Sequence, residues 1–404
     1  MIKKIGLVLL FLAVTVGIGF ALYRIVFGPL SPAEIPPGGE DLVNVAPGGL
    51  PSAQPGTPTG TPTGTETGLP NAQVSPVASG GLTKVTTIAP VPTSGAMLTS
   101  LGDLNYYNRN DGKFYRVLSD GTIQQLSGKT FFNVEQASFS PKGDTAIIEY
   151  PDGSNIFYDF NSDKQVTLPK HWQDFDFSPQ GSSIVTKSIG LDPANRFLII
   201  SSPDGSNARP IQELGNNADK VQVAWSPNNQ IVATATTGDK RGVDGQEVFF
   251  LGQNHENFRS IMVDGLDFRP SWAPDGERLL YSVAGSLSDY KPQLWIVDAS
   301  GDDIGLNRRM LNVNTWSDKC TFAGTNMLYC AVPRDLPRGA GLQPTVADST
   351  PDDIIGIDLT TGLQTQVAIP EGNHTVGSIM VTADHSKLLF TDRGSGMLNE
   401  LRLR

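Results

Sequence analysis

Histidine is the first residue type in this sequence that could support metal or acid–base chemistry, and four are present: His171, His255, His374 and His385. His171 follows the segment QVTLPK and His374 follows QVAIPEGN, so both occupy the same kind of connection between predicted strands. Such connections share one face of a repeating β fold, whereas the other two histidines fall in turns of the opposite face. A metal site needs at least a third ligand, and none stands in a matching position. We therefore expect exposed loop histidines, with no metal ion and no cofactor.

Cysteine offers a second kind of chemistry, and the chain has only Cys320 and Cys330, too few for a structural zinc site. The two residues flank a predicted hairpin turn in CTFAGTNMLYC, centred on Gly324 to Asn326. A turn of roughly three residues brings the flanking strands close enough for a disulfide. In an oxidising compartment the pair forms a disulfide; two free thiols in the core are the alternative. The sequence predicts a structural Cys320–Cys330 bond and no redox catalysis.

Motifs of the common catalytic sites are absent from the chain. It contains no G-x-S-x-G nucleophile turn, no H-E-x-x-H zinc motif, no EF-hand loop and no P-loop. The formal net charge is −11, without a local run of basic residues, and nucleic-acid binding requires a basic surface. We therefore expect a protein that is not an enzyme and that has no nucleic-acid partner.

A repeated pattern after Gly81 indicates the fold that positions these residues. Each copy has an apolar or aromatic residue, a turn rich in Ser, Pro, Asp and Gly, and a β-branched run. Clear copies begin at Ala137 (ASFSPKGDTAIIEY), Asp174 (DFDFSPQGSSIVTKS), Gln222 (QVAWSPNNQIVATAT) and Arg269 (RPSWAPDGERLLYSV), and degenerate copies begin at Asp318 and Ser378. The aligned apolar positions are Phe139, Phe177, Trp225, Trp272, Cys320 and Val381. A period of roughly 40–50 residues with four short strands per unit is typical of β-propeller blades.

Counting an earlier, weaker unit near Met97, the pattern predicts an all-β propeller of seven four-stranded blades, with six or eight as alternatives. In the fifth unit we expect strands at Pro270–Trp272, Arg278–Val283, Gln293–Asp298 and Arg309–Asn312. The last unit has only three predicted strands. The segment Lys84–Pro90 (KVTTIAP) matches the fourth strands QVTLPK and QVAIPE. We therefore expect it to complete the last blade and close the ring, which leaves no long exposed edge.

These units resemble the WD-type propeller repeats of the TolB family, periplasmic proteins of the Tol–Pal system. The resemblance covers roughly Leu82 to Arg404 and rests on Trp225-Ser226-Pro227, on Trp272-Ala273-Pro274-Asp275-Gly276 and on their weaker copies. It implies a propeller with a binding role in the cell envelope. The sequence departs from TolB, because it lacks the small α/β domain that precedes the propeller there, so no Pal-binding residues are carried over. TolB-like oligogalacturonate lyases, which hold a metal by channel histidines, make an enzyme the alternative.

The N-terminal region predicts a membrane anchor. Residues 5–22 (IGLVLLFLAVTVGIGFAL) are uncharged and long enough to cross ~30 Å of hydrocarbon as a helix. Lys3 and Lys4 precede this run, and the segment that follows it is acidic, so the positive-inside rule places the N-terminus in the cytoplasm. A cleaved signal peptide is the alternative. We thus expect a single-pass protein of the cell membrane with an extracytoplasmic propeller.

These patterns predict that the chain has three parts. Residues 1–27 are the cytoplasmic tip and transmembrane signal-anchor helix. Residues 28–81 are a disordered linker, because they are rich in Pro, Gly and Thr and lack apolar periodicity. Residues 82–404 are the TolB-like propeller.

Long connections between second and third strands mark a candidate binding surface. Four successive units have them, at Lys187–Arg196, Thr236–Glu247, Ala284–Pro292 and Pro333–Asp353. In a propeller these connections share a face, and long loops on a rigid scaffold are where binding sites usually lie. Their bases and apolar side chains suit an apolar centre with a polar rim. The candidate residues are Leu191, Arg196, Lys240, Arg241, Tyr290, Lys291, Arg334, Leu336, Arg338 and Leu342.

The sequence therefore predicts a non-catalytic binding or scaffold module of the cell envelope. Its expected partner is an envelope protein or peptide, bound on the face that carries the long loops, and the membrane is contacted through the N-terminal helix. Surface loops without a ligand are one alternative. A TolB-like lyase or hydrolase that acts on an extracellular polymer is the other.

Overall fold

The computed structural model describes residue 17 and residues 73–404. The predicted transmembrane helix and most of the predicted linker lie outside these residues. Within the described part of the chain, no helix combines the length and the apolar character needed to span a membrane.

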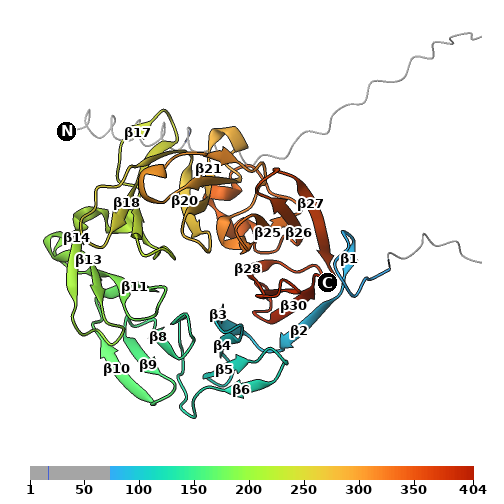
Figure 1. The fold of residues 1–404 in the computed structure, drawn as a ribbon, viewed down its shortest axis with the longest axis horizontal. Coiled ribbons are helices and arrows are strands. Elements are labelled where there is room, and N and C mark those ends of the chain that lie inside the picture. Colours follow the sequence, from blue (N-terminus) through green and yellow to red (C-terminus); the bar gives the residue numbers. More distant parts are fainter. Residues whose placement is uncertain (1–16, 18–72) are drawn as a thin grey trace, which may run out of the picture. The chain divides into compact units, whose positions relative to one another are not determined.

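Seven sheets follow one another around a central axis, and they are antiparallel except for one short parallel pair described below (Figure 1). In each sheet the first strand lies nearest the axis and the last lies at the rim. Blade 1 contains β3 (Thr93–Leu98), β4 (Leu104–Asn108), β5 (Lys113–Val117) and β6 (Ile123–Gln125); blade 2 contains β7 (Gln136–Phe139), β8 (Thr145–Glu149), β9 (Asn155–Asp159) and β10 (Lys164–Leu168); blade 3 contains β11 (Trp172–Phe177), β12 (Ile184–Ile189), β13 (Arg196–Ser201) and β14 (Arg209–Glu213).

Blade 4 differs from the others by a short additional strand. It contains β15 (Val221–Val223), β16 (Ile231–Ala235), β18 (Gly245–Gly252) and β19 (Ile261–Asp264), and β17 (Lys240–Arg241) pairs with the start of β18. Blade 5 contains β20 (Leu266–Trp272), β21 (Arg278–Ala284), β22 (Pro292–Asp298) and β23 (Arg309–Met310); blade 6 contains β24 (Cys320–Ala323), β25 (Met327–Pro333), β26 (Asp352–Asp358) and β27 (Gln364–Pro370); blade 7 contains β28 (Val376–Val381), β29 (Lys387–Asp392) and β30 (Leu398–Arg402). The predicted all-β fold with seven blades is confirmed.

The connections between strands lie on two opposite faces of the propeller. The loop face carries the second-to-third and fourth-to-first connections, and the turn face carries the other two kinds. Short 3-10 helices on the loop face are η1 (Pro193–Asn195), η2 (Gly215–Lys220), η3 (Ser286–Ser288), η5 (Ser317–Lys319), η6 (Ala340–Leu342) and η7 (Pro344–Ala347), and η4 (Gly301–Asp303) lies on the turn face.

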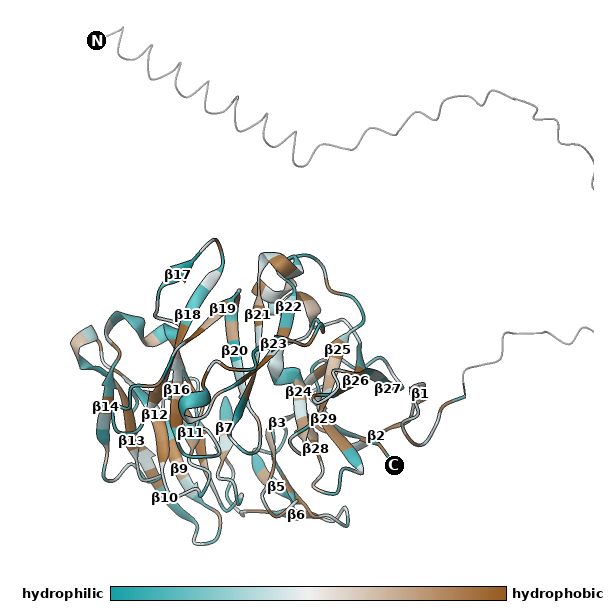
Figure 2. Cartoon of the chain, turned by 45° about the horizontal axis from the view of Figure 1, so that its top comes forward, coloured by the Kyte–Doolittle hydropathy of each residue, from teal (hydrophilic) through white to brown (hydrophobic). Residues whose placement is uncertain are grey.

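The hydrophobic core fills the spaces between neighbouring blades, and apolar strand positions are brown in Figure 2. Leu280 and Leu294 of blade 5, for example, pack with Leu328 of blade 6. Between blades 1 and 2, Phe114 meets Phe139 edge to face with ring centroids 5.7 Å apart. Because each blade buries both of its faces against a neighbour, the ring is stabilised by apolar burial all the way round.

The repeated Ser-Pro-Asp-Gly turn joins blades as well as strands. In blade 5, Gly276 has φ +71° and donates its N–H to the carbonyl of Ala273 (2.8 Å). Its carbonyl accepts a hydrogen bond from Asn228 Nδ2 of blade 4 (2.8 Å). A Cβ at this position would lie 2.6 Å from the Asn228 backbone nitrogen. Glycine is therefore required both for the turn and for the contact with the preceding blade.

One of the apolar positions aligned in the sequence repeat, Cys320, was wrong. Trp272 lies opposite Leu279 in blade 5, and the residue in the corresponding place in blade 6 is Phe322, opposite Leu328. The sequence alignment placed Cys320 there, two residues too early. Blade 6 has a shorter turn without the Ser-Pro-Asp-Gly sequence, so the pattern gave no marker for the register.

The predicted ring closure is confirmed. β2 (Val85–Ala89) pairs antiparallel with β30 and forms the outer strand of blade 7. β1 (Leu82–Thr83) additionally pairs parallel with β27 as a fifth strand of blade 6, which the sequence did not predict. The N-terminal strands therefore join blade 6 to blade 7.

Residues just before β1, which the sequence assigned to the linker, also contact the propeller. Ala78 donates its N–H to the carbonyl of Arg402, and Gly80 donates to the carbonyl of Val367, both at 2.8 Å. We call residues 75–89 the closing segment, because all of their strands and these hydrogen bonds tie the last two blades together.

Candidate functional site

The four long loops predicted from the sequence are joined on the loop face. They comprise residues 190–195, 236–244, 285–291 and 334–351, and we call them together the four-loop surface. Gly339 N–H donates to the carbonyl of Asp289, and Gly341 N–H donates to that of Tyr290, both at 2.9 Å, so the last two loops are bonded to each other. Ser286 N–H donates to an Asp244 carboxylate oxygen, which links the second loop to the third.

The first loop joins this surface through a helix between blades. Its helix η1 lies against η2. Lys220, the last residue of η2, accepts a hydrogen bond at its carbonyl from Thr236 N–H of the second loop (3.0 Å). Figure 2 shows the β17–β18 hairpin and the helical segments beside β21 and β22 projecting on the same side. Segments far apart in sequence therefore form one continuous surface over blades 3 to 6.

Unusual backbone geometry allows the third and fourth loops to meet. Asp289 and Tyr290 both have positive φ, +54° and +56°. A Cβ on Gly341 would lie 2.5 Å from the Cβ of Ala284 and 2.9 Å from the carbonyl oxygen of Tyr290. Since such contacts exclude any side chain, glycine at position 341 is required for this junction. The junction is built into the fold, and Tyr290 is held half-buried within it.

Two of the three leucines expected as exposed anchors are exposed. Leu191 is fully exposed, and Leu342 is exposed over nearly half of its surface. Leu336 is the correction, because only 5% of it is exposed. It packs with Trp316, Ala340 and Ala347 beneath the fourth loop. Leu336 therefore holds the loop on the scaffold and is not available to a partner.

The same loops expose further apolar residues that the sequence did not predict as binding residues. Val243, at the tip of the β17–β18 hairpin, is 89% exposed, and Leu287, in η3, is 80% exposed. Val346, in η7, is also exposed. Each of the four loops thus carries at least one large apolar side chain in solvent. We call Leu191, Val243, Leu287, Leu342 and Val346 the apolar tip residues.

The predicted basic residues fall into two groups, and the first is committed to the scaffold. Arg334 Nε donates to Asp353, and its Nη1 donates to the Asn373 side chain, both at 2.8 Å. Arg196 Nε donates to the carbonyl of Gly190 at 3.0 Å. These two arginines hold the ends of their loops.

The second group points to solvent. Lys240 and Arg241 are exposed, and Lys291 is half-buried; none of the three has an ion pair within the described residues. Arg338 lies 3.8 Å from an equally exposed Asp289, a pair that contributes little in water. These four bases are available to a partner.

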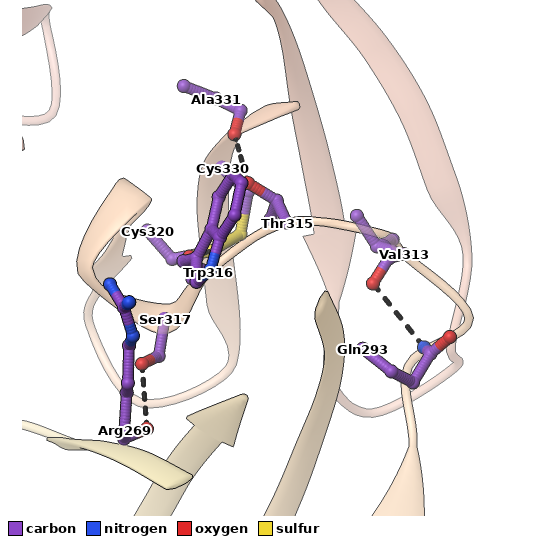
Figure 3. Close-up of a disulfide and its surroundings, with 9 residues drawn as sticks. All are labelled: Arg269, Gln293, Val313, Thr315, Trp316, Ser317, Cys320, Cys330 and Ala331. Atoms are coloured by element: carbon purple, nitrogen blue, oxygen red, sulfur yellow. Dashed lines mark hydrogen bonds between the residues drawn. A yellow bond between two sulfur atoms is a disulfide. The ribbon is translucent and has the colours of Figure 1, made fainter. Parts of the chain in front are cut away.

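A disulfide joins the two strands that precede the fourth loop, and Figure 3 shows it with its surroundings. Cys320 and Cys330 stand directly opposite each other on β24 and β25, and the structure joins them by an S–S bond. The Sγ of Cys320 is 3.7 Å from the carbonyl oxygen of Trp316, the residue on which Leu336 packs. The bond therefore braces the hairpin that supports the fourth loop.

The histidines do not converge. His171 and His374 lie in fourth-to-first connections on the loop face, and His255 and His385 lie on the turn face. His374 Nδ1 is 3.0 Å from an oxygen of Asp392. Among residues 73–404, no group of three or more His, Cys, Asp or Glu side chains is arranged to hold a metal ion.

No protein-family model and no curated protein matches the sequence. The fold is similar to an oligogalacturonate lyase in complex with manganese, with a TM-score of 0.54 and 14% identity over 79% of this chain and 93% of that chain. It is similar to an oligogalacturonate lyase from Vibrio parahaemolyticus, with a TM-score of 0.54 and 12% identity over 79% and 93%. The β-propeller domain of Swd1 from Myceliophteria thermophila gives a TM-score of 0.54 and 12% identity over 79% and 100%. At these identities the likeness establishes a seven-bladed β-propeller and no narrower family.

Proposed function

We propose that this chain is a non-catalytic binding or scaffold module of the cell envelope, which recognises a protein partner through the four-loop surface. The observation that carries the proposal is that each of the four loops of this surface exposes a large apolar side chain. Single exposed apolar residues are common on soluble proteins. A set gathered on one side of a rigid scaffold and surrounded by polar residues is typical of an interaction site.

The polar surroundings fit a protein partner. Lys240, Arg241 and Arg338 lie near the apolar tip residues, together with Asp239 and Asp289. Protein interfaces combine a desolvated apolar centre with such a mixed rim, and a few anchors carry most of the binding energy. The tips occupy four different loops, so no single loop would suffice.

Substitution of the tips tests this proposal against a matched control. The full chain carrying Leu191→Asp, Val243→Asp and Leu287→Asp should lose chemical crosslinking to its partner in membranes. The control carries Leu101→Asp, Leu306→Asp and Leu363→Asp, three exposed leucines on turn-face connections. Capture that survives in the first variant and fails in the second would overturn the assignment of the surface.

A TolB-like lyase or hydrolase acting on an extracellular polymer is the second candidate. It is supported by the likeness to two oligogalacturonate lyases, one of them solved in complex with manganese. Metal analysis of the purified full chain distinguishes the proposed binding module from the proposed enzyme. A stoichiometric transition metal would favour the enzyme, whereas its absence together with partner capture would favour the binding module.

The membrane location is part of the same proposal. The apolar run at residues 5–22 and the two lysines before it support a cytoplasmic N-terminus and an extracytoplasmic propeller. Protease added to intact spheroplasts should release a soluble fragment that begins within residues 28–81. Protection of the propeller would reverse the orientation.

A further inference from the structure

A groove opens at the rim between blades 5 and 6, next to the four-loop surface. One wall is the segment 312–314, which follows β23, and the other is the segment 364–366, at the start of β27. Lys291 and Arg334, from the third and fourth loops, also line it. Its volume is about 410 Å³, within the range of roughly 300–1,000 Å³ typical of ligand pockets.

The walls of this rim groove are fixed by hydrogen bonds. Gln364 Nε2 donates to the carbonyl of Leu311 (2.6 Å) and so ties one wall to the other. Asn314 Nδ2 donates to the carbonyl of Pro292 (3.1 Å). Gln293 lies beside Val313 (Figure 3), and with its side-chain amide turned so that both ends are satisfied, its oxygen accepts the N–H groups of Asn312 (3.3 Å) and Val313 (3.2 Å). The groove is therefore preformed, and binding requires little ordering of the protein.

Polar and apolar groups in the groove match an extended peptide. Val332 and Ile355, which are both half-buried, provide apolar surface. The side-chain amides of Asn312 and Gln366 have no hydrogen-bond partner within the described residues. An amide side chain offers a donor and an acceptor together, which complements a backbone peptide group. No described residue that lines the groove is aromatic, so a sugar ring would find no flat side chain on which to stack.

The charges indicate which peptide fits best. Lys291 makes no ion pair within the described residues, whereas Arg334 is already bound to Asp353. Asp335 also lines the groove and is exposed. Lys291 is half-buried as a residue and its ammonium group is uncommitted, so it can pair with a carboxylate in a charge-assisted hydrogen bond.

We propose that the rim groove holds a short extended segment of the protein partner, with an apolar side chain on its valine and isoleucine surface and a carboxylate beside Lys291. This inference rests on the proposed function and adds a second, peptide-specific contact to the apolar tip residues. In this proposal the apolar tip residues contact the folded surface of the partner, and the rim groove binds an extended segment of that same partner.

Selection from a random hexapeptide phage library on the purified full chain tests this inference. The enriched peptides, labelled with fluorescein, should share an acidic residue next to an apolar one. Gln366→Trp fills the groove and should weaken their binding at least about tenfold, which corresponds to ~1.4 kcal/mol. Lys291→Glu should weaken it by a similar factor. The matched controls are Gln124→Trp, on the outer strand of blade 1, and Lys142→Glu, on the turn face, and both should bind as the original chain does.

Every other outcome overturns the inference. Enriched peptides that bind equally to the Gln366→Trp variant do not use the groove, and a selection without enrichment shows that it holds no peptide. Binding of acidic oligosaccharides on a glycan array, lost in Gln366→Trp, would assign the groove to a sugar. The variant with aspartate at Leu191, Val243 and Leu287 should keep the peptide, so failure of the tip surface and failure of the groove are distinguished.

Discussion

Among single residues, Glu149 has a strongly perturbed environment. It ends β8 on the loop face, and one of its buried carboxylate oxygens has no hydrogen-bond partner. Burial, together with the negative charges of Asp174 and Glu135, raises the pKa of Glu149 from 4.5 to about 7. The folded state therefore binds a proton more tightly than the unfolded state. The stability contributed by the protonated carboxyl is lost as the pH rises from about 4.5 through 7.

Glu149→Gln should remove this pH dependence. A neutral amide needs no proton, so the free energy of unfolding should fall less between pH 5 and pH 8 than in the original chain. At pH 8 the variant should be more stable by on the order of 3 kcal/mol, since the pKa rises from 4.5 to about 7 and each pKa unit is worth 1.36 kcal/mol. Urea unfolding at the two pH values measures the effect. Glu371→Gln, at an exposed position after β27 and remote from Glu149, is the control, and equal pH profiles for all three proteins would refute the assignment.

The ion pair of Lys319 and Asp352 is a second residue-scale feature. Both side chains are almost completely buried, and Lys319 Nζ lies 2.7 Å from each carboxylate oxygen. Asp352 also accepts the N–H of Val376 (2.7 Å), so the pair connects blade 6 to blade 7. Removing one partner leaves a buried charge without compensation, which typically costs 3–5 kcal/mol.

A double-mutant cycle tests this pair. Asp352→Asn and Lys319→Met should each lower the free energy of unfolding by about 3 kcal/mol. The double variant, which buries no charge, should be less destabilised than the sum of the two single changes. Additive effects in chemical unfolding would show that the two charges are not coupled.

Among the elements, the β24–β25 hairpin supports the fourth loop through its disulfide and through Trp316. Closing a loop of this length restricts the unfolded chain and contributes about 2–3 kcal/mol. The variant with Cys320→Ala and Cys330→Ala should lose about that much stability, and a reductant should lower the stability of the original chain by a similar amount. Chemical unfolding measures both. A chain whose stability is unaffected by reductant would contradict the structural role.

The closing segment is the second element with a measurable role. A chain that begins at Gln73 keeps all of its described contacts, and one that begins at Lys84 loses β1 and the bonds of Ala78 and Gly80. A chain that begins at Thr93 also loses β2, which exposes the edge of β30 to aggregation. Thermal unfolding temperatures should fall in that order. Equal temperatures for the first and third chains would show that closure does not depend on this segment.

At the scale of the whole molecule, the sequence predicted what is local and repeated. The turn that follows Trp272 recurs from blade to blade, so strand positions and blade count could be inferred from it. The match of Lys84–Pro90 to other fourth strands identified the closing strand for the same reason. Phe322 was missed because its blade lacks the repeated turn.

Exposure within the long loops could not be predicted in the same way. Leu336 and Leu287 are both leucines in loops without periodic neighbours, yet one is buried against Trp316 and the other is in solvent. The difference depends on how residues 334–351 fold over blade 5, and no local pattern encodes that. Loop length predicted that the four loops gather on one face, and only the folded structure could show which side chains are exposed there.

The central claim is that the loop face binds the partner through its apolar tips, and site-specific photo-crosslinking tests it most directly. A photoreactive amino acid is placed singly at Leu191, Val243 or Leu287, and at Leu101, Leu306 or Leu363 on the turn face, in the full chain within its membranes. The account predicts that the three loop-face positions crosslink to one common protein and that the turn-face positions do not. A common protein captured only from the turn face would contradict it.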